Sequence, residues 1–363
     1  MHSRSDSCPR SCLGSFPERL PLQSRKQDPI FSPTVAEPLN EGGDAMSIEF
    51  TFVPGTDSND FSAAAPFFFD PQASAAALAQ VEDAGFQSVV IDGAAGLLSN
   101  FDLAAKAAAL TSSLQIVLTH CAGVVAPTVA ARQLAALDAA SGGRLALRIL
   151  ADGIVEDGVA TDSHASHIAT CQRTDEYLRL LKRLWSNDKP FDHEGPFYRV
   201  RGGFVPNKGL RGLRIPIRMS GLSGTSLKVA GRHADIFELA PGAPEDVRRL
   251  IERVRAAAAQ YGRSGKIRFA MPLSFTRDRP VSRADAVHVP SFPARSALSL
   301  IAYAQAGVSE FMVTGPYDPE KIERFGQAIA PLLRNPLARK ERRAITPAPE
   351  LSGTSTMGRR LRA

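Results

Sequence analysis

The chain has 363 residues, of which 44% are hydrophobic and 22% are charged, and its formal net charge at pH 7 is +6. This length and apolar content suit one large domain of about 250 to 300 residues with flanking tails. No run of about eighteen apolar residues is present, which excludes a transmembrane helix. The four cysteines are irregularly spaced and form no Cys-x-x-Cys pair. A disulfide framework and a zinc site are therefore not expected, and a reducing cytoplasm fits.

Composition and charge divide the chain into three parts. Residues 1–45 are rich in Ser, Pro, Arg and Gly without periodicity, which predicts a disordered N-terminal extension. Residues 335–363 hold seven Arg or Lys against two Glu, a net charge of +5, and are predicted to be a basic disordered tail. Because residues 1–45 carry −1, the body at 46–334 carries only +2. A specific nucleic-acid-binding surface is therefore not indicated.

The body alternates between short apolar runs typical of buried strands and helical segments. The predicted strands are 48–53, 88–91, 114–119, 145–150, 215–219, 235–239, 266–275 and 310–314. The predicted helices are 70–84, 101–110, 127–141, 173–185, 225–233, 244–261, 293–306 and 318–333. Eight strands, each leading into a helix or a long connection, predict a (β/α)8 TIM barrel over 46–334. A doubly wound open sheet is the alternative, but no Gly-x-Gly-x-x-Gly motif follows the first strand.

Residues 213–239 read as a strand, a small polar turn, a helix and the start of the next strand. The turn consists of Ser220, Gly221, Leu222 and Ser223. Such a turn presents backbone N–H groups and a serine hydroxyl at a helix N-terminus, which suits a phosphate-bearing cofactor. The alternative is that these small residues simply make a tight turn, and the pattern alone leaves both readings open.

Ligands of a (β/α)8 barrel bind at the C-terminal ends of its strands, so polar residues there are candidates. His120 ends the third strand and is the candidate catalytic acid or base. A histidine that only hydrogen-bonds at a strand end is an equal alternative. Thr119 and Asp152 are candidate cofactor contacts, although turn capping explains Asp152 equally well. His164 and His167 are three residues apart, but no carboxylate follows at metal-ligand spacing, so no metal site is predicted.

Several motifs resemble those of the bacterial luciferase-like flavin monooxygenases, particularly the alkanesulfonate monooxygenase branch. They are Ala126–Gln133, Ser141–Arg144, Arg173–Tyr177, Phe191–Val200 and Ser220–Asp235, and the similarity covers residues 48–334. The resemblance implies a barrel that binds reduced FMN non-covalently and uses it with O2 on a small organic substrate. It also implies a separate NAD(P)H-dependent flavin reductase, a homo-oligomer, and flavin contacts from Ser220–Ser223 and His167.

The sequence departs from that branch where the branch holds flavin and substrate. Pro272 and Ser274 stand on the seventh strand in place of an Arg and a His, and Thr170 and Cys171 replace an Arg-Tyr pair. The insertion between the seventh and eighth strands shrinks to residues 277–292. Because a sulfonate needs cationic partners, we expect an altered substrate and inefficient sulfonate oxidation. A non-catalytic barrel that serves as a partner subunit or flavin-binding protein is the alternative.

Overall fold

The computed structural model describes residues 48–54, 71–92, 100–150, 164–274, 287–288, 293–315 and 317–334. Within these residues, eight parallel strands close into a barrel in the order β1-β2-β3-β4-β7-β8-β9-β11, and β11 pairs with β1. They are β1 (Glu49–Pro54), β2 (Ser88–Ile91), β3 (Gln115–Cys121), β4 (Leu145–Leu150), β7 (Ile217–Met219), β8 (Ile236–Glu238), β9 (Arg268–Ser274) and β11 (Glu310–Gly315). The predicted (β/α)8 TIM barrel is therefore confirmed.

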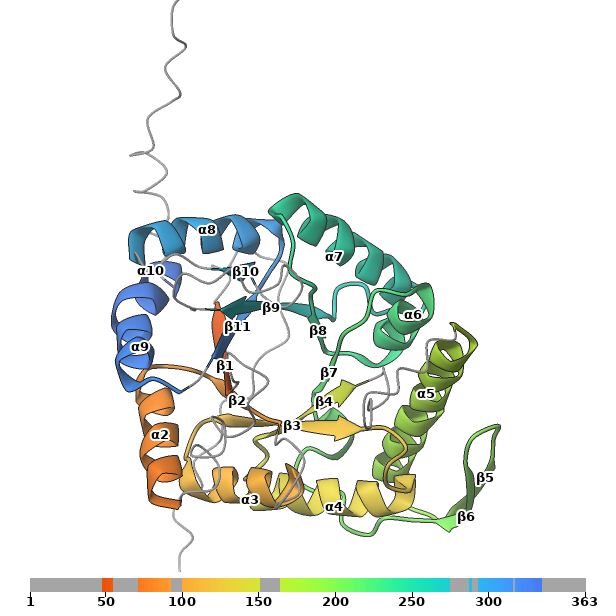
Figure 1. The fold of residues 1–363 in the computed structure, drawn as a ribbon. Helices are drawn as coiled ribbons and strands as arrows, with labels where there is room; N and C mark the ends of the chain where they lie inside the picture. The colour runs from red at the N-terminus through yellow and green to blue at the C-terminus, as the bar shows by residue number, and fades with distance from the viewer. Residues whose placement is uncertain are drawn as a thin grey trace, which may run out of the picture. The chain divides into compact units, whose positions relative to one another are not determined.

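Helices surround the strands as an outer ring (Figure 1). They are α2 (Pro71–Asp83), α3 (Asn100–Leu110), α4 (Pro127–Ala140), α5 (His164–Ser186), α6 (Gly224–His233), α7 (Pro244–Ala259), α8 (Pro293–Ala306), α9 (Pro319–Arg324) and α10 (Ala330–Arg334). A π-helical segment, Phe325–Ile329, joins α9 to α10. The prediction for α5 was wrong at its start, because the helix begins at His164 and not at Arg173.

Side chains on the strands alternate between the barrel interior and the helix layer. Val90, Val117 and Ala146 belong to a small buried cluster inside the barrel. Ile116 and Leu118 belong to the larger core between strands and helices. On β3, residues 117, 119 and 121 therefore face inward, whereas residues 116, 118 and 120 face the helices. This alternation decides which strand-end residues can reach a bound ligand.

An antiparallel hairpin of β5 (Phe191–Glu194) and β6 (Arg199–Gly203) follows α5. It is anchored to α5 by Glu176, a carboxylate only 1% exposed. Glu176 accepts hydrogen bonds from Nε2 of His193 at 2.8 Å and from the backbone N–H of Tyr198 at 3.1 Å. His193 and Tyr198 thus belong to a hairpin that this buried carboxylate fixes to α5.

Several sequence predictions lie outside the described residues. They concern the N-terminal extension 1–45, the basic tail 335–363, and most of the shortened insertion at 277–292. From that insertion the structure describes only β10 (Val287–His288), which pairs in parallel with the end of β9. Among the described residues, no helix is both long enough and apolar enough to cross a membrane.

Candidate functional site

The turn between β7 and α6 forms a cradle at a helix N-terminus. Ser223 is the N-cap of α6, and its Oγ accepts a hydrogen bond from the backbone N–H of Ser226 at 3.0 Å. Gly221 has φ +133, and a Cβ at this position would lie 2.5 Å from Oγ of Ser226. Only glycine fits there, because both the backbone angle and the close approach exclude a side chain. The turn therefore holds its backbone N–H groups in a fixed, open arrangement.

His167, in the first turns of α5, meets this cradle. Its Nε2 lies 2.8 Å from Oγ of Ser223 and 3.7 Å from Sγ of Cys171. From the other side, Arg253 on α7 donates a hydrogen bond to the carbonyl of Leu222 at 3.0 Å. An imidazole, a hydroxyl, a guanidinium and the positive end of a helix dipole thus gather at one turn, which suits an anion.

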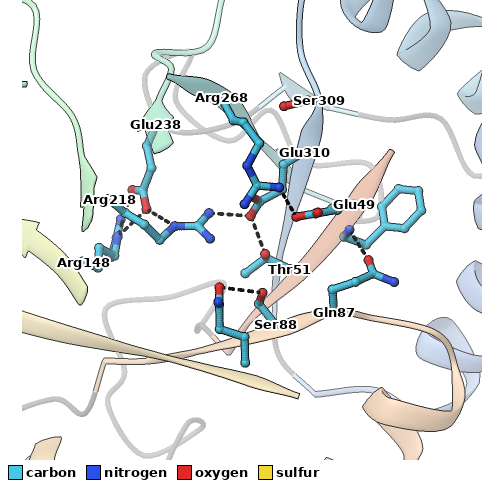
Figure 2. Close-up of polar contacts among 12 residues, drawn as sticks. Glu49, Thr51, Gln87, Ser88, Arg148, Arg218, Glu238, Arg268, Ser309 and Glu310 are labelled. Atoms are coloured by element: carbon cyan, nitrogen blue, oxygen red, sulfur yellow. Dashed lines mark hydrogen bonds and ion pairs between the residues drawn. The ribbon is translucent and has the colours of Figure 1, made fainter. Parts of the chain in front are cut away.

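A network of charged side chains runs through the barrel interior, and Figure 2 shows four of its members, Arg148, Glu238, Arg218 and Glu310. We call its five members, Asp92, Arg148, Glu238, Arg218 and Glu310, the charge network. Arg218 is fully buried and donates through Nη2 to Glu310 at 2.5 Å and through Nε to Glu238 at 3.2 Å. Arg148 donates through Nε to Glu238 at 2.9 Å and through Nη1 to Asp92 at 3.1 Å. The network therefore runs from the barrel core to the C-terminal end of β2.

The charged states of these groups follow from burial and pairing. Burial alone would raise the pKa of Glu310, but Arg218 and the hydroxyl of Thr51 outweigh it and hold this pKa below its usual value. The two carboxylates likewise overcome burial and raise the pKa of Arg218. Burial raises the pKa of Asp92 above its usual value despite the opposing charge of Arg148. The network is thus charged at its core and titratable at its outer end.

His120 points away from the barrel interior, which differs from the expectation for a residue at the mouth. Its Nε2 lies 2.7 Å from the hydroxyl of Tyr177 on α5, and its ring packs edge-on against Phe101 on α3. Burial lowers the pKa of His120 to about 4, so the imidazole is neutral at pH 7. This placement fits the alternative of a hydrogen-bonded histidine outside the barrel, and a catalytic role for His120 stays a prediction.

The other predicted contacts separate into two places. Ser220, Gly221, Leu222, Ser223 and His167 lie together at the cradle. Thr119 faces the barrel interior with its hydroxyl, near the charge network rather than beside the cradle. Cys121 shares this direction, and burial together with the charge of Asp92 raises its pKa, so it is a poor nucleophile. Asp152 lies outside the described residues.

Sequence reasoning named none of the five members of the charge network as site residues, and four of them lie inside strands. Arg148, Arg218, Glu238 and Glu310 each stand in a strand that is otherwise largely apolar. A single charge within a buried strand was the available signal, because such a charge needs a partner. The sequence alone does not say which partner, since the paired residues come from different strands.

The chain matches a known protein family over most of its length. Residues 49–337 match the model of the luciferase-like monooxygenases. The chain belongs to the luciferase-like monooxygenase family. Its enzymatic character is supported at the level of this family, whose model describes monooxygenases.

Solved structures share the fold of this luciferase-like barrel at low identity. EDTA monooxygenase from Chelativorans sp. BNC1 is 16% identical, with 83% of this chain and 95% of that one covered and a TM-score of 0.65. Riboflavin lyase with modified FMN is 16% identical, covers 79% and 91%, and has a TM-score of 0.65. An F420-dependent secondary alcohol dehydrogenase is 17% identical, covers 80% and 100%, and has a TM-score of 0.63. These likenesses show the fold, and the alkanesulfonate branch stays a prediction.

Proposed function

We propose that this luciferase-like barrel is an FMN-dependent monooxygenase acting on a small organic substrate. The observation that supports it most is the cradle, where Ser223 and His167 converge on the N-terminus of α6. Gly221 lies beside them at a position where a side chain does not fit. In this proposal the cradle holds the phosphate of FMN. The relative solved with modified FMN has the same fold and supports FMN as the cofactor.

The chain's own residues have separate tasks in this proposal. The N–H groups of Gly224 and Thr225, which open α6, and the hydroxyl of Ser223 bind the phosphate, and His167 orients that hydroxyl. Reduced FMN with O2 supplies one oxygen atom to the substrate and one to water, and the flavin leaves oxidised. The charge network keeps the barrel interior polar. The proposal includes a separate NAD(P)H-dependent flavin reductase, a homo-oligomer and a cytoplasmic location.

The substrate differs from an alkanesulfonate in this proposal. Pro272 and Ser274 occupy the end of β9, and neither can neutralise a sulfonate. Arg148 is a cation near the mouth, but it is bound by Asp92 and Glu238. The absence of the Arg and the His that the alkanesulfonate monooxygenase branch carries on this strand also favours the second candidate. That candidate is a non-catalytic barrel that serves as a partner subunit or binds flavin without turnover.

Titration of the full chain with FMN and with riboflavin, each oxidised and reduced, tests the proposal. We expect Ser223→Ala to weaken FMN binding by about 1–2 kcal/mol, or roughly 5- to 30-fold, because a hydrogen bond to a charged phosphate is lost. Riboflavin lacks the phosphate, so its affinity should not change. Ser186→Ala, at the opposite end of α5, is the matched control. Equal effects on both flavins would contradict the phosphate placement, and no binding of either flavin would favour the non-catalytic barrel.

A further inference from the structure

The most exposed member of the charge network at the barrel mouth is a carboxylate, Asp92. The Asp92 side chain is 42% exposed, whereas Arg148 is 22% and Glu238 is 7% exposed. Arg148 already binds both carboxylates through Nε and Nη1. Three carboxylates and two guanidinium groups give the network a net charge of −1. A ligand that enters the mouth therefore meets negative charge first.

A second hydrogen-bond acceptor lies beside Asp92. Ile91 pairs with Leu118 across β2 and β3, so Asp92 and Thr119 are neighbours at the ends of these strands. Thr119 is 4% exposed and faces inward; its hydroxyl lies close enough to Asp92 to lower the pKa of that carboxyl, and its Oγ1 accepts no hydrogen bond among the described residues. Arg148 contacts only Oδ2 of Asp92. A buried hydroxyl and a carboxylate oxygen thus offer acceptors at one place.

We propose that the substrate carries a protonated amine whose N–H groups donate to Asp92 and Thr119. This inference rests on the proposed function and adds a substrate class to it. An ammonium group has three donors and no acceptor, so it matches a carboxylate oxygen beside a hydroxyl oxygen that accepts no other hydrogen bond. A sulfonate or carboxylate would be repelled by Asp92. The two guanidinium groups of the charge network cannot offset this repulsion, because they are already bound to carboxylates. A metal ion fits less well, because Arg148 already contacts both Asp92 and Glu238.

The inference is tested by the binding of three ligands that share a hexyl group and differ only in their polar head. The FMN-loaded full-length protein is titrated by calorimetry with hexylammonium, hexanol and hexanesulfonate. We expect hexylammonium to bind at least about 10-fold more tightly than hexanesulfonate, because a charge-assisted hydrogen bond replaces a repulsion. Asp92→Asn should weaken hexylammonium about 10-fold and leave hexanol within about two-fold. Thr119→Val should weaken hexylammonium about three-fold, since one neutral hydrogen bond is lost.

Controls separate the inference from the proposed function. Asp83→Asn makes the same chemical change at an exposed position of α2 and should leave all three affinities unchanged. Hexylammonium affinity that is unchanged in both the Asp92 and Thr119 variants overturns the inference. Tighter binding of hexanesulfonate, or no hexylammonium binding up to about 10 mM, also overturns it. FMN affinity is measured separately and the hexylammonium titration is repeated without FMN, so a barrel that binds hexylammonium through Asp92 without binding FMN would refute only the proposed function.

Discussion

Arg218 is the residue whose removal should damage the barrel most. It is fully buried and joins Glu238 at 3.2 Å to Glu310 at 2.5 Å. Arg218→Met keeps the volume but leaves the fully buried Glu310 without its cation. Removing one partner of a buried ion pair costs about 3–5 kcal/mol, because the remaining charge is uncompensated. That cost is a large share of the roughly 5–15 kcal/mol by which domains are usually stable.

Urea denaturation followed by the fluorescence of Trp185 measures this loss. Trp185 is the single tryptophan, it is buried in α5, and its Nε1 donates to the carbonyl of Ala131 on α4. The control Arg214→Met makes the same change at an exposed position just before β7 and should cost less than about 0.5 kcal/mol. The double variant of Arg218→Met with Glu310→Gln should recover part of the loss, because the unpaired charge is removed.

The pH dependence of the Arg218→Met variant has a definite sign. Without Arg218, burial raises the pKa of Glu310 above its usual value. A carboxyl with a raised folded-state pKa contributes stability below its unfolded pKa and loses this contribution as the pH rises through the folded value. The deficit of the variant should therefore be largest at pH 7 and smaller at pH 5. A cost below about 1 kcal/mol, or a deficit that grows on acidification, would refute the role assigned to this ion pair.

Two further predictions concern stability. Burial opposes ionisation of Glu82, but hydrogen bonds from Ser113 and Ser112 outweigh it and lower its pKa to about 2. Its contribution is present above the unfolded pKa and is lost as the pH falls, so Glu82→Gln should cost about 1 kcal/mol at pH 7 and progressively less below pH 4.5 in urea denaturation. A difference that is constant with pH would contradict this. Gly231→Ala puts a Cβ 2.8 Å from the backbone carbon of Ala257 on α7 and should cost about 1–3 kcal/mol in thermal unfolding. Gly224→Ala, which has open space, is the control, and equal losses would contradict the contact.

The strands could be predicted from the sequence because their signals are local. Short apolar runs bounded by Gly, Pro and polar residues placed every barrel strand within two residues of its observed ends. The start of α5 could not be predicted in this way. Residues 164–172 mix small or apolar residues with polar ones, and contacts such as that of His167 with Ser223 hold this turn in place. Tertiary contacts override weak local preference here.

The turn of the cradle could be predicted, because its residues are consecutive in the sequence. The charge network could not be predicted, because its members come from different strands. Ser223 follows a strand and precedes a helix, which already indicated an N-cap. Thr51 and Glu310 are 259 residues apart and still share a hydrogen bond, and no periodicity reports such a pairing. The direction of His120 depends on strand parity, because a shift of one residue reverses the face that a side chain occupies.

The pairing of β1 with β11 has a consequence for folding during synthesis on the ribosome. Glu49 lies opposite Glu310, so the first strand finds its second neighbour only after 261 further residues have been added. At about 5 to 20 residues per second, this takes roughly 13 to 50 s. During that time Phe50, which later stacks against Phe311 at a ring distance of 6.4 Å, has no partner from the last strand. The nascent chain therefore cannot close the barrel during most of its synthesis and exposes apolar surface. We expect chaperones that shield apolar surfaces to determine the yield of folded protein in the cell.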